Sequence, residues 1–370
     1  MSRTVLAAVM PAPRVPVEIR EFAEPELPMG SALLRTALSE VCGTDVHLWH
    51  GRLSGVPYPI IPGHVTTGTL DQIRGALTDV EGHLLREGDR VAFFDVHRTC
   101  GRCLACTAHR TPTRCPSRRV YGITDSATEG LFGGWAQKVY LEPGVVVARL
   151  PEGVSFESYI GGGCGLLTAV HIIERSRIVL GDTVVVQGAG AVGMSAAALA
   201  RKAGAGRVIV IGAPQSRLDL SGQMGADDVI NIDTTSPEER LAQVLSMTGG
   251  IGADVVIEAA GSARAFEEGL LLARNGGAYV IAGHYTNAGD SVINAHEHIN
   301  RKHLEIRGCW GSEAGHFVRA LSILEQHAAH VPWRDIGAKV YPLDRLNEAL
   351  ADAEAMRLPK ALVDPRTRSA

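Results

Sequence analysis

The chain of 370 residues is too long for one ordinary hydrophobic core, so we expect two domains. Its 45% hydrophobic and 21% charged residues are typical of a globular protein, and its 42 glycines indicate many tight turns. The formal net charge of −4, without any run rich in lysine and arginine, argues against nucleic acid or an anionic membrane surface as a partner.

The N-terminal stretch MSRTVLAAVMPAPRVPVEIR contains an apolar run that is much shorter than the core of a signal peptide. No other stretch is an unbroken apolar run of about 18 residues, as a membrane-spanning helix requires. These observations predict a cytoplasmic protein without a membrane partner.

Up to about residue 155, short apolar runs are broken by glycine and proline. Examples are PYPIIPGH at 57–64 and EGDRVAFFDV at 87–96. This pattern is typical of an irregular, mostly β domain.

Four of the seven cysteines lie in the stretch CGRCLACTAHRTPTRC, as Cys100, Cys103, Cys106 and Cys115. Because cytosolic thiols stay reduced, such a cluster favours metal binding over disulfides. The spacing allows one loop to present four thiolates to a tetrahedral zinc ion. Protein would then fill every ligand position, so this zinc would be structural. The alternative is that these thiols are free or disulfide-bonded.

From about residue 166, continuous apolar runs alternate with helical segments. The predicted strands are 182–190, 207–213, 252–261 and 278–284, and the predicted helices between them are 191–205 and 263–277. Apolar strands that alternate with helices indicate an α/β unit with a parallel sheet covered on both faces. After about residue 310, segments 316–330 and 342–356 predict amphipathic helices, and 360–365 predicts a strand that returns to the first domain.

The motif GAGAVG follows a predicted strand and opens a predicted helix. In this setting Gly188 makes the turn, Gly190 allows the backbone to approach a pyrophosphate, and Gly193 allows close packing of helix and strand. The amide protons at the helix N-terminus would face the phosphates of a dinucleotide. The alternative is a glycine-rich turn that binds nothing.

One part of the dinucleotide pattern is missing. An Asp or Glu about 20 residues onward normally accepts the ribose hydroxyls, but the second strand ends at Gly212 and continues with Ala213 and Pro214. Ser216 and Arg217 follow, and they suit either a ribose or a 2′-phosphate. The sequence therefore permits both NAD(H) and NADP(H), and we lean toward NADP(H). The alternative for Arg217 is a solvated helix residue.

Three further residues have zinc-ligand chemistry: Cys42 in CGTDVH, His64 in PGH and Cys164 in GGGCGLLTA. Two thiolates and one imidazole would leave a fourth zinc position open for water or an alcohol, as a catalytic site requires. From spacing alone, these residues could equally be ordinary core side chains.

The order of CGTDVH, GH, the four-cysteine lobe, GCGLLT and GAGAVG resembles that of the zinc-containing medium-chain alcohol dehydrogenases, over essentially the whole chain. The resemblance implies a Rossmann doubly wound parallel sheet at 166–310, inserted in a GroES-like, mostly β catalytic domain formed by 1–165 and 311–370. It also implies a structural zinc in the lobe at 97–116. By position, the catalytic zinc ligands are Cys42, His64 and Cys164, so that each chain would hold two zinc ions.

The same resemblance implies roles for five more residues. Thr44 would take the proton of the substrate alcohol, and His47 would pass it toward solvent. Asp45 would orient the ligand histidine, Thr168 would support the nicotinamide, and Lys360 would reach the pyrophosphate. The alternatives are a turn hydroxyl for Thr44, a surface imidazole for His47 and a solvated charge for Lys360.

Two departures from the family pattern stand out. The family usually has Glu directly after the ligand histidine, and here Val65 takes its place. The last gap in the cysteine lobe is one residue longer than is common.

The resemblance implies a zinc-dependent, NAD(P)-linked alcohol dehydrogenase, active as a homodimer or homotetramer. Trp49, Tyr58 and Trp310 suggest an apolar cleft for a bulky or cyclic secondary alcohol, unless they are core or interface residues. The alternative functions are a zinc-binding carbonyl or enone reductase and a non-catalytic NAD(P)H-binding protein.

Overall fold

The computed structural model describes residues 3–327, 330–334 and 336–369. The chain divides into two compact units, which are described separately here. The first contains the described residues within 1–163, 313–328 and 333–370, and the second contains those within 164–312 and 329–332. The central domain predicted from the sequence, 166–310, is slightly shorter than this second unit.

The first unit is built mainly from antiparallel strands. A seven-stranded sheet has the order β16-β17-β3-β4-β5-β9, and β8 pairs with β3 outside this order. Its longest strand, β3, is buried along its whole length except at Arg35. The strands of this sheet are β3 (Ser31–Val41), β4 (Thr66–Arg74), β5 (Arg90–Phe93), β8 (Lys138–Leu141), β9 (Val147–Arg149), β16 (Ala338–Pro342) and β17 (Lys360–Asp364).

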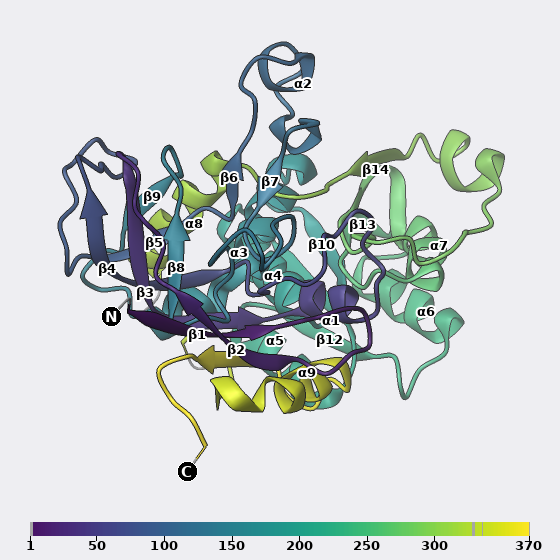
Figure 1. Cartoon of the computed structure of the whole chain (residues 1–370). Coiled ribbons are helices and arrows are strands. Elements are labelled where there is room, and N and C mark those ends of the chain that lie inside the picture. Colours follow the sequence, from purple (N-terminus) through teal and green to yellow (C-terminus); the bar gives the residue numbers. More distant parts are fainter. Residues whose placement is uncertain (1–2, 328–329, 335, 370) are drawn as a thin grey trace. The chain divides into compact units, whose positions relative to one another are not determined.

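Two antiparallel pairs complete the β structure of the first unit. One is β1 (Thr4–Val9) with β2 (Glu18–Ala23), and the other is β6 (Val96–Arg98) with β7 (Arg119–Val120). The cysteine lobe follows β6 and contains α2 (Leu104–Thr107) and the short 3₁₀ turn Pro112–Arg114. Figure 1 shows the lobe projecting beyond β6 and β7.

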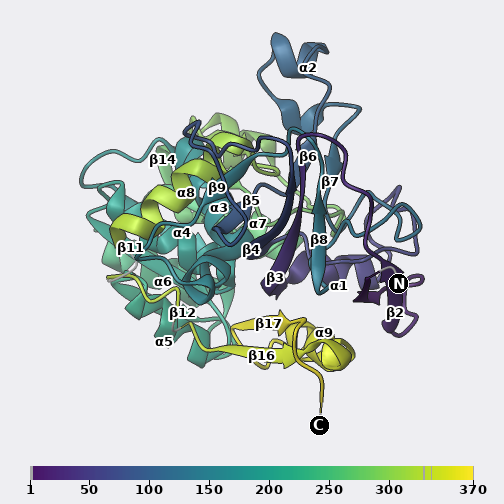
Figure 2. The same cartoon turned by 60° about the vertical axis from the view of Figure 1, so that its left-hand side comes forward.

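The C-terminal segment adds its own layer to the first unit. Strand β17 pairs antiparallel with β3 and parallel with β16, which confirms the strand predicted at 360–365. Figure 2 shows β16 and β17 beside α9. The helices of this unit are α1 (Gly43–Trp49), α8 (Ala314–His327) and α9 (Leu346–Glu354), with a 3₁₀ turn at Leu343–Arg345. Helix α3 (Phe156–Ser176) begins in this unit and continues into the second.

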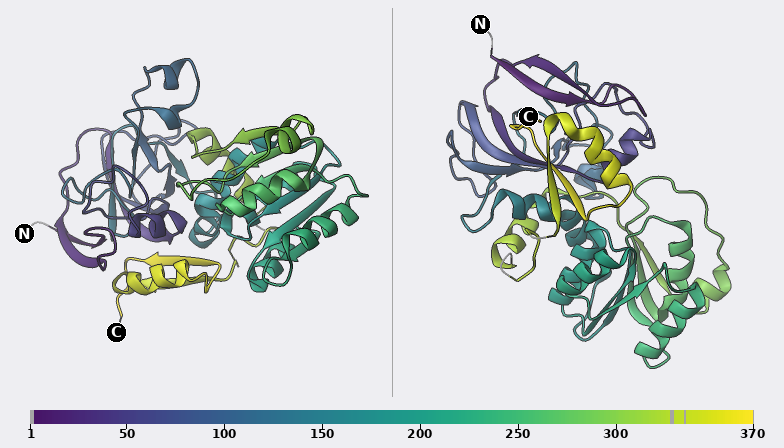
Figure 3. Two further views of the ribbon diagram at one scale, coloured as in Figure 1. Left: turned by 90° about the vertical axis from the view of Figure 1, so that its right-hand side faces the viewer. Right: turned by 90° about the horizontal axis from the view of Figure 1, so that it is seen from below.

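The second unit is an α/β layer structure with a parallel sheet, as predicted. The strand order is β12-β11-β10-β13-β14-β15. From β10 the chain adds β11 and β12 on one side and then returns to add β13, β14 and β15 on the other. In a doubly wound sheet, ligands bind at this change of side, at the carboxyl ends of the strands. Helices α4 and α5 pack together, as do α6 and α7, and Figure 3 shows helices on both faces of the sheet. The bounds are β10 (Thr183–Gln187), α4 (Ala191–Lys202), β11 (Arg207–Gly212), α5 (Gln215–Gln223), β12 (Asp228–Asn231), α6 (Pro237–Met247), β13 (Ala253–Glu258), α7 (Ala263–Leu272), β14 (Ala273–Ile281), the short helical turn His296–Asn300 and β15 (Glu305–Gly308).

All four predicted helices differ from the structure at an end, and the one predicted at 191–205 ends at Lys202. The helix predicted at 263–277 ends at Leu272, because Ala273 has an extended backbone, with φ −71° and ψ 141°, and is the first residue of β14. The helix predicted at 342–356 starts only at Leu346, after a 3₁₀ turn. The helix predicted at 316–330 ends at His327, and its residues 328 and 329 lie outside the described residues.

Apolar side chains form a core on each sheet. In the second unit, fully buried Val185, Val256 and Leu270 belong to one cluster, and each contributes about 1.5–3 kcal/mol by its burial. This packing gives the glycine-rich turn after β10 a rigid support. Within the described part of the chain, no helix combines the length and the apolar character that crossing a bilayer requires.

Candidate active site

Three side chains with metal-ligand chemistry come together from distant parts of the sequence. The ligand atoms of Cys42, His64 and Cys164 all lie within 4.8 Å of one another. Cys42 Sγ is 3.9 Å from His64 Nε2. Two sulfurs and one imidazole nitrogen are ligands that zinc prefers, and three protein ligands leave a tetrahedral ion one open position. The donor set therefore fits a catalytic zinc.

Cys42 is held by the start of α1, which follows β3 directly. It is the N-cap of that helix, with extended backbone angles of −125° and −177°. Thr44 N donates to Cys42 Sγ over 3.3 Å, and Cys42 N donates to Asp45 Oδ2 over 2.9 Å. This reciprocal capping box fixes the direction of the sulfur before any metal binds.

Cys164 follows a break inside α3. Gly163 has φ 46° and ψ −146°, which interrupts the helical backbone. A side chain at Gly163 would collide with its surroundings, since a Cβ there would lie 2.1 Å from Glu40 Oε2. The kink therefore depends on glycine, and it sets the position from which the Cys164 side chain starts.

The four cysteines of the lobe also meet at one point. The sulfurs of Cys100, Cys103, Cys106 and Cys115 all lie within 4.8 Å of one another. Backbone N–H groups of Arg102 and Cys103 lower the pKa of the Cys100 thiol to about 6, because they donate to its sulfur. Four thiolates in a loop with little core of its own suit a closed, structural zinc.

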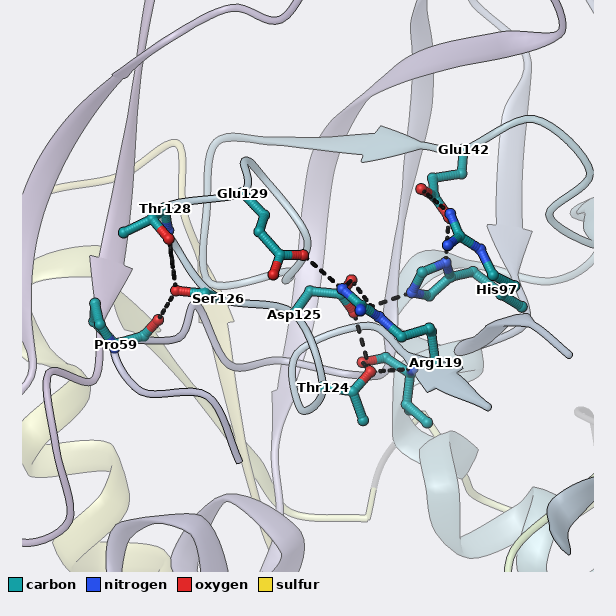
Figure 4. A network of polar contacts seen from close by, with 11 residues as sticks. Pro59, His97, Arg119, Thr124, Asp125, Ser126, Thr128, Glu129 and Glu142 are labelled. Carbon is teal, nitrogen blue, oxygen red and sulfur yellow. Dashed lines mark hydrogen bonds and ion pairs between the residues drawn. The ribbon is translucent and has the colours of Figure 1, made fainter. Parts of the chain in front are cut away.

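A polar network lies at the base of the lobe, on β6, β7 and the segments that follow β7 (Figure 4). His97 Nδ1 lies 2.7 Å from Glu142 Oε2, and His97 Nε2 lies 3.0 Å from Asp125 Oδ2. Arg119 Nε donates to Asp125 Oδ1 over 3.0 Å and also pairs with Glu129. His97 precedes the lobe and Arg119 follows it, so the network joins the two chain segments that carry the cysteines.

The glycine motif after β10 has a distinct geometry at each position. Gly188 has a φ of 112°, and a Cβ there would lie 2.7 Å from Ala259 O. A Cβ at Gly193 would lie 1.8 Å from Gly188 O, so helix α4 and the turn touch at this point. A Cβ at Gly190 would meet nothing within 4 Å, so space is open in front of the N-cap of α4. An open helix N-terminus of this kind suits a phosphate group.

Comparison with protein families agrees with this geometry. Residues 28–152 match the family "alcohol dehydrogenase GroES-like domain", and residues 191–326 match "zinc-binding dehydrogenase". The 5-exo-hydroxycamphor dehydrogenase of Pseudomonas putida is 33% identical over 338 residues, which are 90% of this chain and 92% of the relative. The chain belongs to the zinc-containing medium-chain alcohol dehydrogenases.

Solved structures support the same family. An alcohol dehydrogenase from Thermotoga maritima matches with a TM-score of 0.92 and 33% identity, over 98% of this chain and 99% of the other. A zinc-binding dehydrogenase from Sinorhizobium meliloti, bound to NADP, matches with a TM-score of 0.85 and 26% identity, over 98% and 100%. These findings confirm the predicted Rossmann and GroES-like architecture. This dehydrogenase is thus a zinc-dependent oxidoreductase that acts on the CH–OH groups of small alcohols with NAD(P).

Electrostatics around the three-residue cluster of this dehydrogenase favour a cation. Burial lowers the pKa of His64, but the charge of the neighbouring Cys42 thiolate outweighs burial and raises that pKa to about 10. Burial raises the pKa of Asp45 well above its ordinary value, and the Cys42 thiolate adds to this effect. Asp45 Oδ1 and His64 Nδ1 are both buried without a hydrogen-bond partner, so the two side chains do not form the hydrogen bond that an orienting role for Asp45 requires. That role stays a prediction.

The two residues of the predicted proton relay lie on α1. Thr44 and His47 are three residues apart, which puts them on one face of the helix. Burial lowers the pKa of His47 from its ordinary value of 6.5, and the positive charge of Arg52 lowers it further. Arg52 Nη1 lies 3.5 Å from His47 Nδ1. His47 is therefore neutral at neutral pH and able to accept a proton.

The end of β11 in the dehydrogenase lacks a carboxylate, as the sequence indicates. Gly212 ends the strand, Ala213 and Pro214 follow, and α5 begins at Gln215. Arg217 lies in the first turn of α5, half-buried, and burial lowers the pKa of its guanidinium. A desolvated cation beside the end of the second strand is suited to an anionic ligand.

Lys360 is buried and not a solvated charge. Its Nζ is 3.0 Å from Glu40 Oε1 and donates to Gly161 O over 2.9 Å, within the first unit. Sequence analysis missed Glu40. The available signal was a single acidic residue at the end of the strand, two residues before Cys42. The predicted contact of Lys360 with a pyrophosphate remains a prediction.

Three other residues complete the comparison with the sequence. Thr168 lies on α3, one helical turn after Cys164, and is partly buried. Val65 is buried. Cys309 is buried outside both cysteine clusters, and burial raises the pKa of its thiol to about 12.

Proposed function

We propose that this dehydrogenase interconverts a bulky or cyclic secondary alcohol and its ketone, with a catalytic zinc held by Cys42, His64 and Cys164. The observation that carries this proposal is the convergence of two sulfurs and one imidazole nitrogen within 4.8 Å. When bound, the zinc would lower the pKa of a coordinated alcohol, and the nicotinamide would accept the hydride.

The residues of the chain would supply positioning and proton transfer. Thr44 would accept a hydrogen bond from the alcohol and pass its proton to His47, whose lowered pKa keeps it neutral and ready to accept. Thr168 would support the nicotinamide, and Asp45 would orient His64. These assignments rest on the resemblance to the family, and the residues lie on α1 and α3.

A second zinc per chain is part of the proposal. Cys100, Cys103, Cys106 and Cys115 would hold it without an open position, and its role would be to stabilise the lobe. Thiolate ligands require reduced cysteines, and none of the seven cysteines takes part in a disulfide. A reducing, cytoplasmic location suits this requirement.

We propose NADP(H) as the preferred coenzyme. Gly188, Gly190 and Gly193 would receive the pyrophosphate, and Arg217 would face the 2′-phosphate. Ala213 supports this preference, because no carboxylate is present at that position to repel the phosphate. The related dehydrogenase from Sinorhizobium meliloti is bound to NADP.

The substrate class rests on relatives more than on the predicted aromatic cleft. The relative from Pseudomonas putida is named for a hydroxycamphor, a cyclic alcohol. Trp49 and Tyr58 pack against the core of the first unit, and Tyr58 Oη donates to Leu48 O over 2.6 Å. These contacts support the alternative that the two aromatics are core residues. We also propose that the enzyme is a homodimer or homotetramer.

The test is an activity screen on the purified enzyme. Cyclic and short linear alcohols are compared with NAD and NADP by the absorbance of the reduced nicotinamide, and zinc is quantified on the same samples. We expect turnover of cyclic secondary alcohols, two zinc ions per chain, and loss of turnover together with one zinc in Cys42→Ala. Full activity of metal-free enzyme or of Cys42→Ala would contradict the proposed site.

A further inference from the structure

A buried ion pair lies next to the proposed zinc ligands. Glu40 and Lys360 have side chains that are only 1% and 2% exposed, and Lys360 Nζ is 3.0 Å from Glu40 Oε1. They come from neighbouring antiparallel strands, β3 and β17, whose register pairs Ala361 with Val41. Two charges so deeply buried are stable only as a pair, so each side chain holds the other in place.

The ion pair supports the kink that precedes Cys164. Lys360 Nζ donates to Gly161 O over 2.9 Å. The α-carbon of Gly163 faces both charged groups, since a Cβ there would lie 2.1 Å from Glu40 Oε2 and 2.5 Å from Lys360 Nζ. The carboxylate and the ammonium thus form the surface on which the residues before Cys164 lie.

Glu40 is also tied to the other two proposed ligands. It lies two residues before Cys42 on β3, and its backbone N–H donates to Val65 O over 3.0 Å, directly after His64. Trp135 Nε1 donates to Glu40 O over 3.0 Å, which anchors this part of β3. One residue therefore connects, through its backbone or its side chain, to the segments that carry all three ligands.

We propose that Glu40 and Lys360 are positioning residues for the catalytic zinc. Their ion pair keeps the kink at Gly163 in register with β3, and this places the Cys164 sulfur beside the Cys42 sulfur and the His64 imidazole nitrogen. Neither charged group binds the metal. The inference rests on the proposed binding of zinc by these three ligands, and it gives Lys360 a different role from contact with the pyrophosphate, which would require the ammonium to leave its pair.

The experiment compares Lys360→Met and Glu40→Gln with the wild-type holoenzyme. The control is Lys138→Met, which removes another lysine of the same sheet, paired with Glu24 and Asp71 and remote in sequence from the ligands. Zinc release to a chelator and the sulfur-to-metal absorption of the cobalt-substituted enzyme are measured, together with KM for the coenzyme. We expect zinc affinity of one site per chain to fall by about 10- to 100-fold in both test variants. The control should retain wild-type zinc, and KM for the coenzyme should not change in any variant.

Changes in coenzyme KM, zinc retention and the cobalt spectrum distinguish the positioning role from the alternatives. A raised KM for the coenzyme with wild-type zinc retention in Lys360→Met would overturn the proposal in favour of the pyrophosphate contact. Wild-type zinc retention and an unchanged cobalt spectrum in Glu40→Gln would also overturn it, and this variant decides if Lys360→Met does not fold, because the amide keeps the shape of the carboxylate. A wild-type enzyme that contains no zinc sensitive to Cys42→Ala would instead refute the proposed function itself.

Discussion

His97 Nε2 lies 3.0 Å from Asp125 Oδ2, and both side chains are almost completely buried. The second ring nitrogen of His97 faces Glu142, so carboxylates occupy both ends of the imidazole. Arg98 pairs with Glu142, and Arg119 pairs with Asp125, which compensates the charges of the network. The network fastens the two chain segments that enter and leave the cysteine lobe.

Asp125→Asn should destabilise the first unit strongly at neutral pH. The substitution removes the buried carboxylate that pairs with Arg119 and that His97 Nε2 faces, and loss of such a buried charged hydrogen-bond partner costs about 1–3 kcal/mol. Urea unfolding measures the loss. The control Glu81→Gln makes the same chemical change on a side chain that is 73% exposed, and it should cost less than about 0.5 kcal/mol.

The effect of Asp125→Asn should depend on pH. Burial raises the pKa of Asp125, but hydrogen bonds from His97 and Arg119 outweigh burial and hold the pKa below its ordinary value. A lowered pKa contributes stability above the unfolded value of about 3.9, and this contribution is lost as pH falls through the folded value. The difference in unfolding free energy between wild type and variant should therefore be largest at neutral pH and shrink in acid. A difference that stays constant down to acid pH would contradict this account.

Cys103→Ser should remove one zinc per chain and loosen the lobe. The lobe has little apolar core, so loss of its metal should cost more than about 4 kcal/mol, as losses of structural metals do. Metal analysis and protease sensitivity of 100–115 are the measurements. Cys309→Ala changes a buried thiol outside both clusters and should keep both zinc ions. Equal zinc content in wild type and Cys103→Ser would exclude the structural site.

The fold could be predicted from the sequence where local patterns repeat. Apolar strands alternating with helices predicted the parallel sheet, because strands buried on both faces need no polar positions. The strand order could not be predicted, because it depends on how the helices that connect the strands pack on the sheet, which the local sequence patterns do not show. The start of β14 was missed because the helical pattern of α7 runs on into Ala273, and only the extended backbone of Ala273 in the structure shows where the helix ends.

The site could be predicted where chemistry lies in short motifs. Cys42, His64 and Cys164 are identified by resemblance, and the structure brings their ligand atoms together. Glu40 and Lys360 escaped prediction as a pair because they are separated by most of the chain. A charged side chain is normally read as solvated, and only the antiparallel register of β3 and β17 buries these two together.

Arg52→Met should move the pH dependence of alcohol oxidation. Oxidation requires neutral His47. Burial lowers the pKa of His47 most, and the positive charge of Arg52 lowers it further. Removal of that charge raises this pKa, so the acid limb of kcat/KM should shift to higher pH. Arg86→Met, the same change at an exposed position, should leave the limb in place.

Thr44→Val should lower kcat by about 10²–10⁴-fold with both zinc ions retained, as for loss of a proton-transfer group.

Arg217→Met should weaken NADP selectively. Its guanidinium would lose a charge-assisted contact with the 2′-phosphate, so the affinity for NADP should fall by about tenfold, or about 1.4 kcal/mol, while that for NAD changes little. Ala213→Asp should shift preference further toward NAD, because a carboxylate at the end of β11 repels the phosphate and accepts the ribose hydroxyls. KM values for both coenzymes provide the measurement, and equal losses for NAD and NADP in Arg217→Met would contradict the assignment.

Gly190→Ala and Gly193→Ala should separate coenzyme binding from stability. A methyl group at Gly193 would collide with Gly188 O, so Gly193→Ala should cost about 1–3 kcal/mol of unfolding free energy or more. A methyl group at Gly190 meets no protein atom within 4 Å, so the cost in stability is about 1 kcal/mol at most, as for other N-cap changes. The methyl group of Gly190→Ala would nevertheless lie where the backbone approaches the pyrophosphate.

Gly190→Ala should therefore lose at least about tenfold in affinity for the coenzyme, or about 1.4 kcal/mol, measured by quenching of protein fluorescence. Gly222→Ala, on α5 with equally open surroundings, should bind coenzyme as the wild type does. Normal binding by Gly190→Ala would show that the coenzyme does not use the N-terminus of α4.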